Sequence, residues 1–231
     1  MRHQRVLARG RGAMGRLMRH EGALAVSLLR WVARRPAHGV GPGDTAVGYA
    51  SAQAVTMWVA VFASVVETVV LALLVPWPLV HLLALVVGLW SVFFALGHHA
   101  ACTVRPHVVG ADGSLRVRYG ALLDVRVPAE CIAAVRLERR FPEGGLLRLG
   151  EDGTVDIAVA GQTTVTVELS GPVMFRRPLG RAARASRALR FHADDARAVA
   201  TALERAVRGR KAAVSGEWEP VRRKGIRCGD T

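Results

Sequence analysis

The stretch that decides the fold is VTMWVAVFASVVETVVLALLVPWPLVHLLALVVGLWSVFFALG, residues 55–97. It contains two apolar runs, 55–75 and 79–97, separated only by Pro76-Trp77-Pro78. The first run is 21 residues long with Glu67 as its one charge, and the second is 19 residues long with no formal charge. A helix needs about 20 apolar residues to cross the hydrocarbon core of a bilayer, so each run is long enough to cross. Because the connection is too short for a soluble excursion, we predict a transmembrane helical hairpin.

The basic residues around this hairpin predict its orientation. Residues 1–54 carry nine arginines against Glu21 and Asp44, the 76–78 turn carries no charge, and basic residues resume after residue 97. Lys and Arg accumulate on the cytoplasmic side of short membrane segments. We therefore expect a two-pass protein of the cell (inner) membrane with both termini in the cytoplasm. The net charge of +14 over 231 residues would suggest nucleic acid in a soluble protein, but the membrane explains it, and we expect no nucleic-acid partner.

Residues 1–36 are predicted to form a basic amphipathic helix that ends at Pro36. Its apolar arc holds Met14, Leu17, Met18, Leu24, Ala25, Leu28, Leu29, Trp31 and Val32, and its opposite side holds Arg16, Arg19, His20, Arg30 and Arg34. Such a helix suits the plane of an anionic inner leaflet, where Arg16, Arg19 and Arg30 would contact anionic phospholipid. The other interpretation is a helix that packs its apolar stripe against the cytoplasmic domain. A Gly-rich linker is expected over 37–54.

After the hairpin, the hydrophobic pattern changes from a helical period to alternation. Strands are predicted at Leu115–Tyr119, Ile132–Arg139, Thr154–Ala160, Thr163–Leu169 and Ala188–His192. Asp194 or Asp195 is then expected to cap a C-terminal helix. The pattern predicts a small α+β domain over 103–208, a bent antiparallel sheet closed by that helix, followed by a basic disordered tail over 209–231.

The order of these elements resembles the bacterial pleckstrin-homology-like (bPH-like) domain. The resemblance rests on Val65-Val66-Glu67, Arg105-Pro106-His107, Leu115-Arg116-Val117-Arg118-Tyr119-Gly120, Val127-Pro128, Ile132-Ala133-Ala134-Val135, the stretch 165–173, and Asp194-Asp195. Over residues 48–207 the chain is similar to a set of small two-helix membrane proteins from high-GC actinobacteria. The resemblance implies a membrane-tethered PH-like β domain. It implies neither an activity nor a lipid-headgroup site.

Glu67 is the most specific candidate residue. It lies eight residues before the end of the first apolar run, which is roughly 12 Å into the membrane at the rise of an α-helix. A carboxylate at that depth is costly and should face protein or water. Three interpretations are open. Glu67 could be a neutral side chain hydrogen-bonded to the second helix near Gly88 and Ser91, a contact with another copy or another membrane protein, or an ion site of an oligomeric transporter.

An arginine cluster is the second candidate site. Six arginines fall in 15 residues with no acid among them: Arg176, Arg177, Arg181, Arg184, Arg187 and Arg190. On a cytoplasmic domain close to the bilayer, this segment could bind anionic lipid headgroups or dock an acidic protein, or it could be a solvated loop.

The sequence contains no common enzyme motif and no convincing metal-binding motif. The sequence has no phosphate-binding glycine loop, no nucleophile elbow and no HExxH motif. His98, His99 and Cys102 form HHxxC, but a zinc site needs a second pair of ligands, so interfacial histidines and a buried cysteine are the preferred interpretation. We expect no cofactor and no catalytic residue. The expected function is a non-enzymatic membrane protein whose PH-like domain serves scaffolding or regulation; the alternative is a subunit of an oligomeric transporter or channel that uses Glu67.

Overall fold

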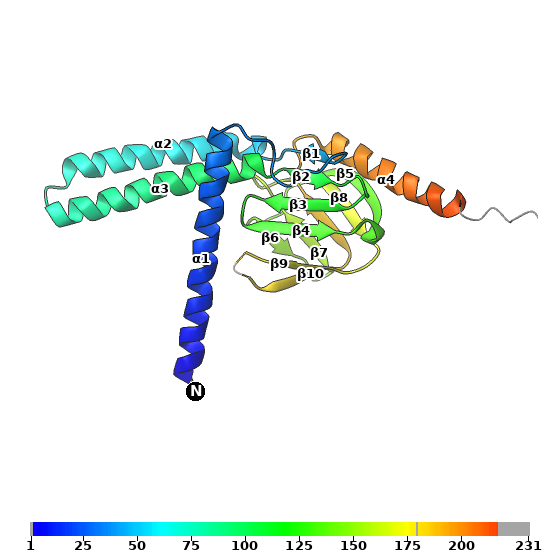
Figure 1. The fold of residues 1–231 in the computed structure, drawn as a ribbon, viewed down its shortest axis with the longest axis horizontal. Helices are drawn as coiled ribbons and strands as arrows, with labels where there is room; N and C mark the ends of the chain where they lie inside the picture. Colours follow the sequence, from blue (N-terminus) through cyan, green and yellow to red (C-terminus); the bar gives the residue numbers. More distant parts are fainter. Residues whose placement is uncertain (1, 179, 217–231) are drawn as a thin grey trace, which may run out of the picture.

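The structure is a computed structural model and describes residues 2–178 and 180–216. Figure 1 shows an apolar helical hairpin joined at one end to a sheet-rich domain, with a long N-terminal helix crossing the hairpin. The helices are α1 (Arg2–Val32), α2 (Ser51–Leu74), α3 (Pro78–Val104) and α4 (Ala196–Gly216). The strands are β1 (Thr45–Val47), β2 (His107–Val109), β3 (Leu115–Tyr119), β4 (Leu123–Val127), β5 (Ile132–Arg140), β6 (Leu147–Leu149), β7 (Thr154–Ile157), β8 (Thr163–Leu169), β9 (Val173–Arg176), β10 (Ala182–Ala185) and β11 (Ala188–Phe191).

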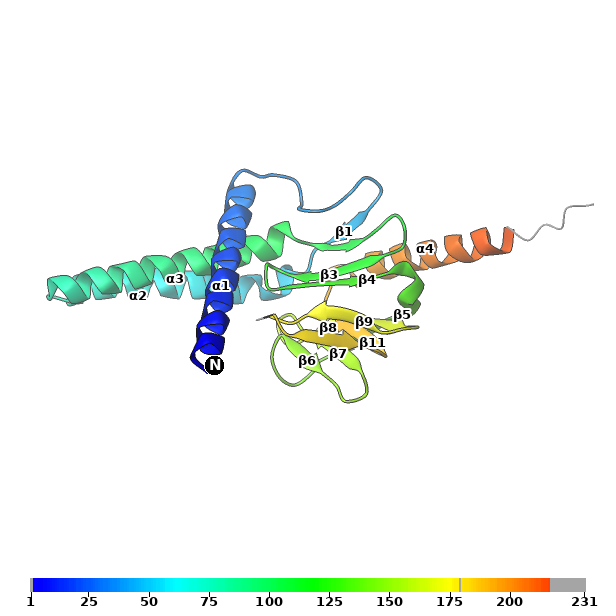
Figure 2. The ribbon, with the colours of Figure 1, turned by 60° about the horizontal axis from the view of Figure 1, so that its bottom comes forward.

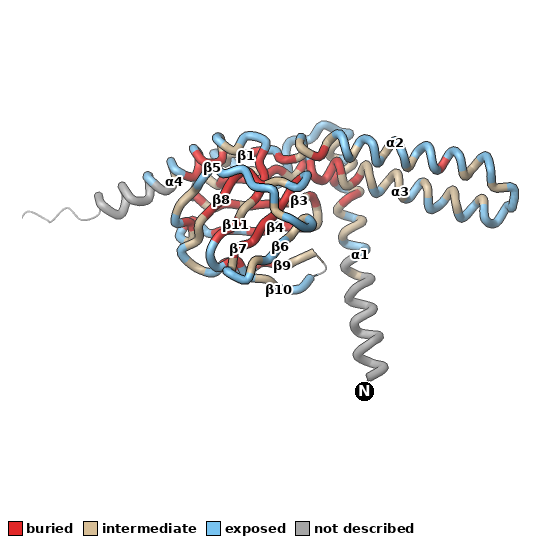
Figure 3. The backbone as a smooth tube through the Cα atoms, turned by 180° about the vertical axis from the view of Figure 1, so that it is seen from behind, coloured by how far each residue is buried: buried red, intermediate tan, exposed pale blue. Residues whose placement is uncertain are grey.

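Helices α2 and α3 form the predicted hairpin, and both are long and apolar enough to span a membrane. Most of their large apolar side chains are exposed, and the burial at the end of α3 is confined to the part that meets the domain (Figure 3). The two helices approach closely at Thr68 and Gly88, where a Cβ on the glycine would overlap the threonine side chain. Pro78 occupies the first turn of α3, where its missing N–H costs nothing.

The hairpin is inserted into a β-sheet rather than placed before it. Strand β1 precedes α2 and pairs antiparallel with β2, which follows α3, with Thr45 opposite Val109 and Val47 opposite His107. The sheet continues in the order β1-β2-β3-β4. The linker predicted over 37–54 therefore contains an edge strand, and the β domain begins at about residue 45 instead of 103.

A second sheet, in the order β5-β8-β11-β7-β6, and the two-stranded β9–β10 ribbon complete the domain. One apolar core joins the two larger sheets, and it includes Val117, Val125, Val167 and Phe191, all fully buried. Val199 and Leu203 of α4 belong to the same core, so the C-terminal helix closes the domain as predicted. The pairing of β7 with β11 is parallel, which the expectation of an antiparallel sheet did not include.

The described side chains of helix α1 pack chiefly on α3 of the hairpin. Leu24 and Ser27 are fully buried, and a Cβ built on Gly97 of α3 would lie 3.1 Å from Leu24 Cβ. Trp31 lies edge-on to His99 of α3, with ring centroids 5.8 Å apart. Figures 1 and 2 show α1 running across the hairpin near its domain end. The alternative interpretation, in which the apolar stripe packs against the cytoplasmic domain, therefore differs from the packing seen, which is on α3.

Several predicted boundaries shift. Helix α2 begins four residues before the predicted 55, and α3 continues to Val104, so the ends of both helices enter the domain. Helix α4 extends to Gly216, so the first residues of the predicted disordered tail are helical, and residues 217–231 lie outside the described part of the chain.

The inserted hairpin predicts which fragments of this chain can fold. A fragment of residues 105–216 lacks β1 and Tyr49, so it leaves β2 unpaired and opens buried surface. We expect it to show no cooperative thermal unfolding by circular dichroism. A matched chain that joins residues 37–51 to 104–216 through a short Gly-Ser linker restores β1 and should unfold cooperatively. Cooperative unfolding of both fragments at the same temperature would contradict the inserted arrangement.

Candidate functional site

Tyr49 sits at the joint between the hairpin and the β domain. Its side chain is fully buried, stacks on His107 with ring centroids 4.5 Å apart, and accepts a hydrogen bond at its hydroxyl oxygen from the Gly120 N–H, at 2.6 Å. Beside it, the Tyr119 hydroxyl donates to Gln53 Oε1 of α2, at 2.9 Å. These contacts connect the first turns of α2 to the β3–β4 turn, so the hairpin and the domain meet through specific polar bonds.

His107 is the buried centre of this joint. Its Nε2 donates to the carbonyl of His192 at 2.8 Å, and its Nδ1 accepts from the backbone N–H of Arg118 at 3.1 Å. Burial lowers the pKa of His107 to about 4, so the ring is neutral at pH 7. Both ring nitrogens are therefore used to hold β2 against β3 and β11.

The sequence predicts that either Asp194 or Asp195 caps α4, and the structure gives the two aspartates different roles. Asp195 Oδ1 accepts the Ala198 N–H at 2.9 Å and caps α4. Asp194 instead accepts from the N–H and the hydroxyl of Ser51, the first residue of α2. A carboxylate at a helix N-terminus is stabilised by the helix dipole. Asp194 therefore ties the start of the hairpin to the end of β11.

A basic cavity of about 500 Å³ opens beside this joint. Six arginines line it: Arg105, Arg116, Arg118, Arg126, Arg176 and Arg177. Asp124 is the only carboxylate among its lining residues, and it forms an ion pair with Arg116. Burial acts to raise the pKa of Asp124, but the hydrogen bonds from Arg116 hold it below its usual value. The cavity therefore carries a large surplus of positive charge.

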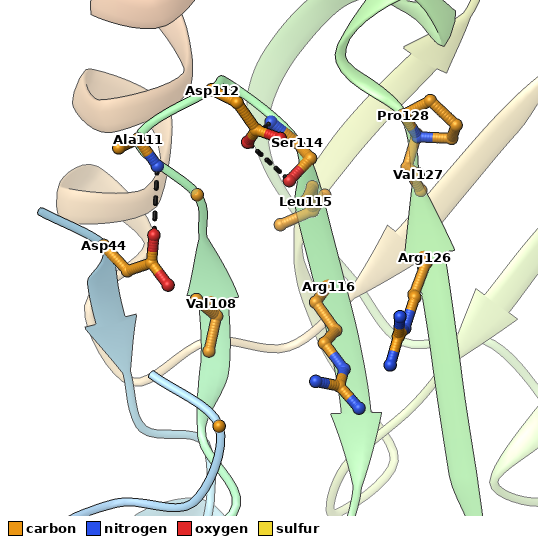
Figure 4. Close-up of a pocket in the computed structure, with 12 residues that line it drawn as sticks. Asp44, Val108, Ala111, Asp112, Ser114, Leu115, Arg116, Arg126, Val127 and Pro128 are labelled. Atoms are coloured by element: carbon orange, nitrogen blue, oxygen red, sulfur yellow. Dashed lines mark hydrogen bonds between the residues drawn. The ribbon is translucent and has the colours of Figure 1, made fainter. Parts of the chain in front are cut away.

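A second cavity, of about 560 Å³, adjoins the first and shares Arg116 and Arg126 with it. Figure 4 shows these two side chains lying side by side on β3 and β4. The carboxylates of this second cavity are engaged in turns, since Asp44 accepts from the Ala111 N–H and Asp112 accepts from Ser114. The outer face of β3 and β4 therefore forms one basic groove, defined by the linings of the two cavities.

Arg118 forms the fixed floor of the groove. Only 2% of the residue is exposed, and its guanidinium donates to the carbonyls of His38 at 2.6 Å and Gly39 at 3.2 Å. Gly39 has φ of +68°, and a Cβ there would lie 2.8 Å from Arg118 Nη2, so a glycine is required at this close approach. Burial lowers the pKa of Arg118 to about 10, which leaves it charged at pH 7.

The predicted arginine cluster is divided by the structure. Arg176, Arg184 and Arg190 lie on strands β9, β10 and β11, and the other three lie in the connections between these strands. Arg176 and Arg177 line the basic cavity, and Arg181 and Arg184 are exposed on the ribbon. Arg187 and Arg190 instead form ion pairs with Asp152 and Asp156.

Two of the three predicted basic residues of α1, Arg19 and Arg30, make local hydrogen bonds to backbone carbonyls. Arg19 Nε donates to the Gly15 carbonyl and Arg30 Nη2 donates to the Pro36 carbonyl. The side chain of Arg16 lies outside what the structure describes. Four arginines of the groove (Arg105, Arg116, Arg118 and Arg126) were not predicted as site residues; the alternation of Arg116 and Arg118 on one strand face was the signal that could have found two of them.

Glu67 is exposed on α2 and forms no hydrogen bond or ion pair with any described residue. The helix contact is made by its neighbour Thr68, and Ser91 donates to the Val87 carbonyl of its own helix. The interpretation that Glu67 bonds to α3 near Gly88 and Ser91 is therefore wrong. The contact with another protein chain and the ion site stay open.

The HHxxC motif does not form part of a larger group of potential metal ligands among the described residues. Cys102 Sγ lies 3.8 Å from His98 Nε2 on the shared helix face, as predicted. His107, by contrast, is engaged with the His192 carbonyl, and no group of three potential metal ligands occurs among the described residues.

Comparison of this chain with protein-family models, curated proteins and solved structures finds no match. The function must therefore be argued from the joint, the basic groove and the hairpin themselves.

Burial of His107 predicts a pH dependence of stability. The pKa of His107 is about 4 in the folded protein and about 6.5 in an unfolded chain. As pH falls from 6.5 to 4, the unfolded chain takes up a proton that the folded chain does not, so stability falls by on the order of 3 kcal/mol and levels off below pH 4. Denaturant unfolding in detergent micelles at several pH values measures this slope.

Two variants isolate the contribution of His107. His107→Gln should lower stability at pH 7 and flatten the slope strongly. His38→Gln, at an exposed histidine whose pKa is lowered by partial burial and by nearby arginines, should flatten the slope less than His107→Gln does. Burial also lowers the pKa of His192, which adds to the slope in the same direction in every variant. Equal slopes in the wild type and His107→Gln would rule out His107 as the titrating group.

Proposed function

We propose that this chain is a non-enzymatic, two-pass membrane protein that holds a PH-like interaction domain against the cytoplasmic leaflet, where it serves as a scaffold or regulator. The observation that carries the proposal is the insertion of the hairpin between β1 and β2. A domain joined to its membrane segment by two paired strands has one pose, whereas a domain on a flexible linker has many. A fixed pose is useful where one face must meet the bilayer and another must meet a partner.

The position of α1 supports this arrangement. Gly97, where α1 crosses, lies nineteen residues after Pro78, or about 28 Å along α3 at the helical rise. The hydrocarbon core is about 30 Å thick, so a bilayer around the hairpin places α1 at its cytoplasmic surface. The exposed apolar side chains of α1, among them Met18, Leu29 and Val32, suit such an interfacial helix.

The position of the β3–β4 and β9–β10 turns, close to the hairpin, supports the same proposal. The β3–β4 and β9–β10 turns lie at the end of the domain nearest to α1 and the hairpin (Figures 1 and 2). Exposed Arg181 lies in the segment that joins β9 to β10, and exposed Arg184 lies on β10 opposite Met174. An anionic leaflet attracts each nearby Arg by about 1 kcal/mol, so the ribbon would rest on the membrane surface.

The proposed PH-like fold rests on the bent sheets and on the C-terminal helix that closes them. The parallel β7–β11 pair and the strand before the hairpin depart from that family's pattern. The fold assignment therefore gives the shape of the domain, and its interaction surface is argued from the residues of this chain.

The experiment uses the full chain in nanodiscs of phosphatidylcholine, with or without about one third phosphatidylglycerol. Amide exchange in the β9–β10 ribbon should slow several-fold in the anionic discs, and salt near 1 M should remove the difference because it screens exposed charges. Arg181→Gln with Arg184→Gln should remove most of the slowing. Arg197→Gln with Arg205→Gln, at exposed positions of α4, provides the matched control. Identical exchange in both kinds of disc would overturn the lipid-facing pose.

Exposed Glu67 favours a second candidate, a subunit of an oligomeric assembly that conducts an ion or proton. One hairpin cannot enclose a pore, and a lipid-facing carboxylate is costly, so this role requires other copies around Glu67. Glu67→Gln should then lower flux across proteoliposomes at least ten-fold while the expressed amount is kept. Val66→Gln, at the neighbouring exposed position, controls for polarity alone. Flux that is absent from the wild type, or equal in Glu67→Gln, excludes this candidate.

A further inference from the structure

The arginines of the basic groove lie close together although like charges repel. On β3 and β4, Arg116 and Arg126 are directly opposite each other in the strand register, and Arg118 is opposite Asp124. Like charges at opposite positions destabilise a sheet. Asp124 binds Arg116, which leaves Arg126 without a hydrogen bond or ion pair among the described residues. The pairing of β3 with β4 therefore places two positively charged side chains, Arg116 and Arg126, opposite each other.

The guanidinium groups at the inner end of the groove are held in place by other parts of the chain. Arg118 donates to the carbonyls of His38 and Gly39, and Arg105 Nε donates to Ser27 Oγ of α1, at 3.3 Å. Arg105 directly follows the last residue of α3. Burial lowers the pKa of Arg105 and Arg118, which shows that this charge is gathered at a cost in solvation. Such fixed positive charges favour an anion bound beside them, because little ordering of these side chains remains to be done on binding.

We propose that the cavity between β3–β4 and β9 binds a phosphate group. Arginine binds phosphate oxygens through paired, roughly parallel N–H donors, and six arginines against one carboxylate exceed what a single carboxylate ligand would need. The cavity of about 500 Å³ has room for a phosphate with a small organic group. Met174, which is 64% exposed, supplies an apolar wall beside the charges.

The phosphate can come from two sources with the same chemistry. One is the phosphomonoester headgroup of a lipid in the adjacent leaflet, and the other is a soluble phosphate ester or inorganic phosphate. This inference deepens the proposed function, since it assigns a ligand class to the basic face. It uses different residues from the test of the pose, because Arg126 and Arg176 line the cavity whereas Arg181 and Arg184 do not.

The experiment measures binding of inorganic pyrophosphate to the full chain in nanodiscs of phosphatidylcholine, by isothermal titration calorimetry. Arg126→Gln with Arg176→Gln should weaken binding at least ten-fold. Both positions are exposed, so the fold should be kept. Arg148→Gln with Arg197→Gln removes the same charge at exposed positions outside the cavity and should leave binding nearly unchanged.

A second arm distinguishes the sources. Discs with phosphatidic acid are compared with discs that carry the same charge as phosphatidylglycerol. Protection of the cavity residues from exchange that is stronger with phosphatidic acid, and that depends on Arg126 and Arg176, supports the lipid headgroup. Pyrophosphate binding without this preference supports a soluble phosphate ester.

Three results overturn the proposal: no binding of either probe, equal losses in the cavity and control variants, or equal affinity for polyglutamate, which indicates an acidic protein partner. If phosphate binding fails while phosphatidylglycerol still protects the β9–β10 ribbon, the pose stands and the phosphate site falls. If phosphate binds in neutral discs while the ribbon is unprotected in anionic ones, the phosphate site stands and the pose falls.

Discussion

The pairing of β1 with β2 is the constraint on which the rest of the structure depends. These strands lie on either side of the hairpin in the chain, so their antiparallel pairing brings both ends of the hairpin to one edge of the domain. Tyr49, two residues after β1, then stacks on His107, the first residue of β2, and Asp194 accepts hydrogen bonds from the first residue of α2. A covalent anchor alone would leave the domain free to rotate. The paired strands and the buried aromatic contact remove that freedom.

The fixed joint also explains where the charge is concentrated. Strands β3 and β4 continue the sheet that starts at the joint, and their outer face carries the groove arginines. The segment after α1 crosses this face and offers the carbonyls of His38 and Gly39 to Arg118. Backbone groups from a segment distant in sequence therefore help to hold this charge at the end of the domain that meets the hairpin. An arrangement that repels itself in isolation is suited to an anionic surface or ligand.

Helix α1 links the same region to the hairpin. Leu24 packs closely on Gly97, and Ser27 accepts a hydrogen bond from Arg105. The apolar arc of this helix is thereby divided between a contact with α3 and an exposed part. A helix that crosses the hairpin at a level about 28 Å from its outer turn matches the thickness of a bilayer core. The amphipathic pattern thus serves protein packing on one part of the helix, and the exposed part is the one that we propose lies at the membrane interface.

Local patterns in the sequence were sufficient to predict the hairpin, strands β3 and β8 and the C-terminal helix, because length, alternation and the Asp195 cap are local properties. Three-residue β1 has no such signal, since its only partner is a strand some 60 residues later. The basic groove combines residues from segments that no spacing relates, and Asp194 accepts hydrogen bonds from the start of a helix 143 residues earlier in the chain. The sequence by itself determined that the chain has a membrane-length hairpin and a β domain. Only the tertiary structure decided that the hairpin is part of the sheet and where the arginines meet, because strand register and nonlocal pairing bring distant residues together.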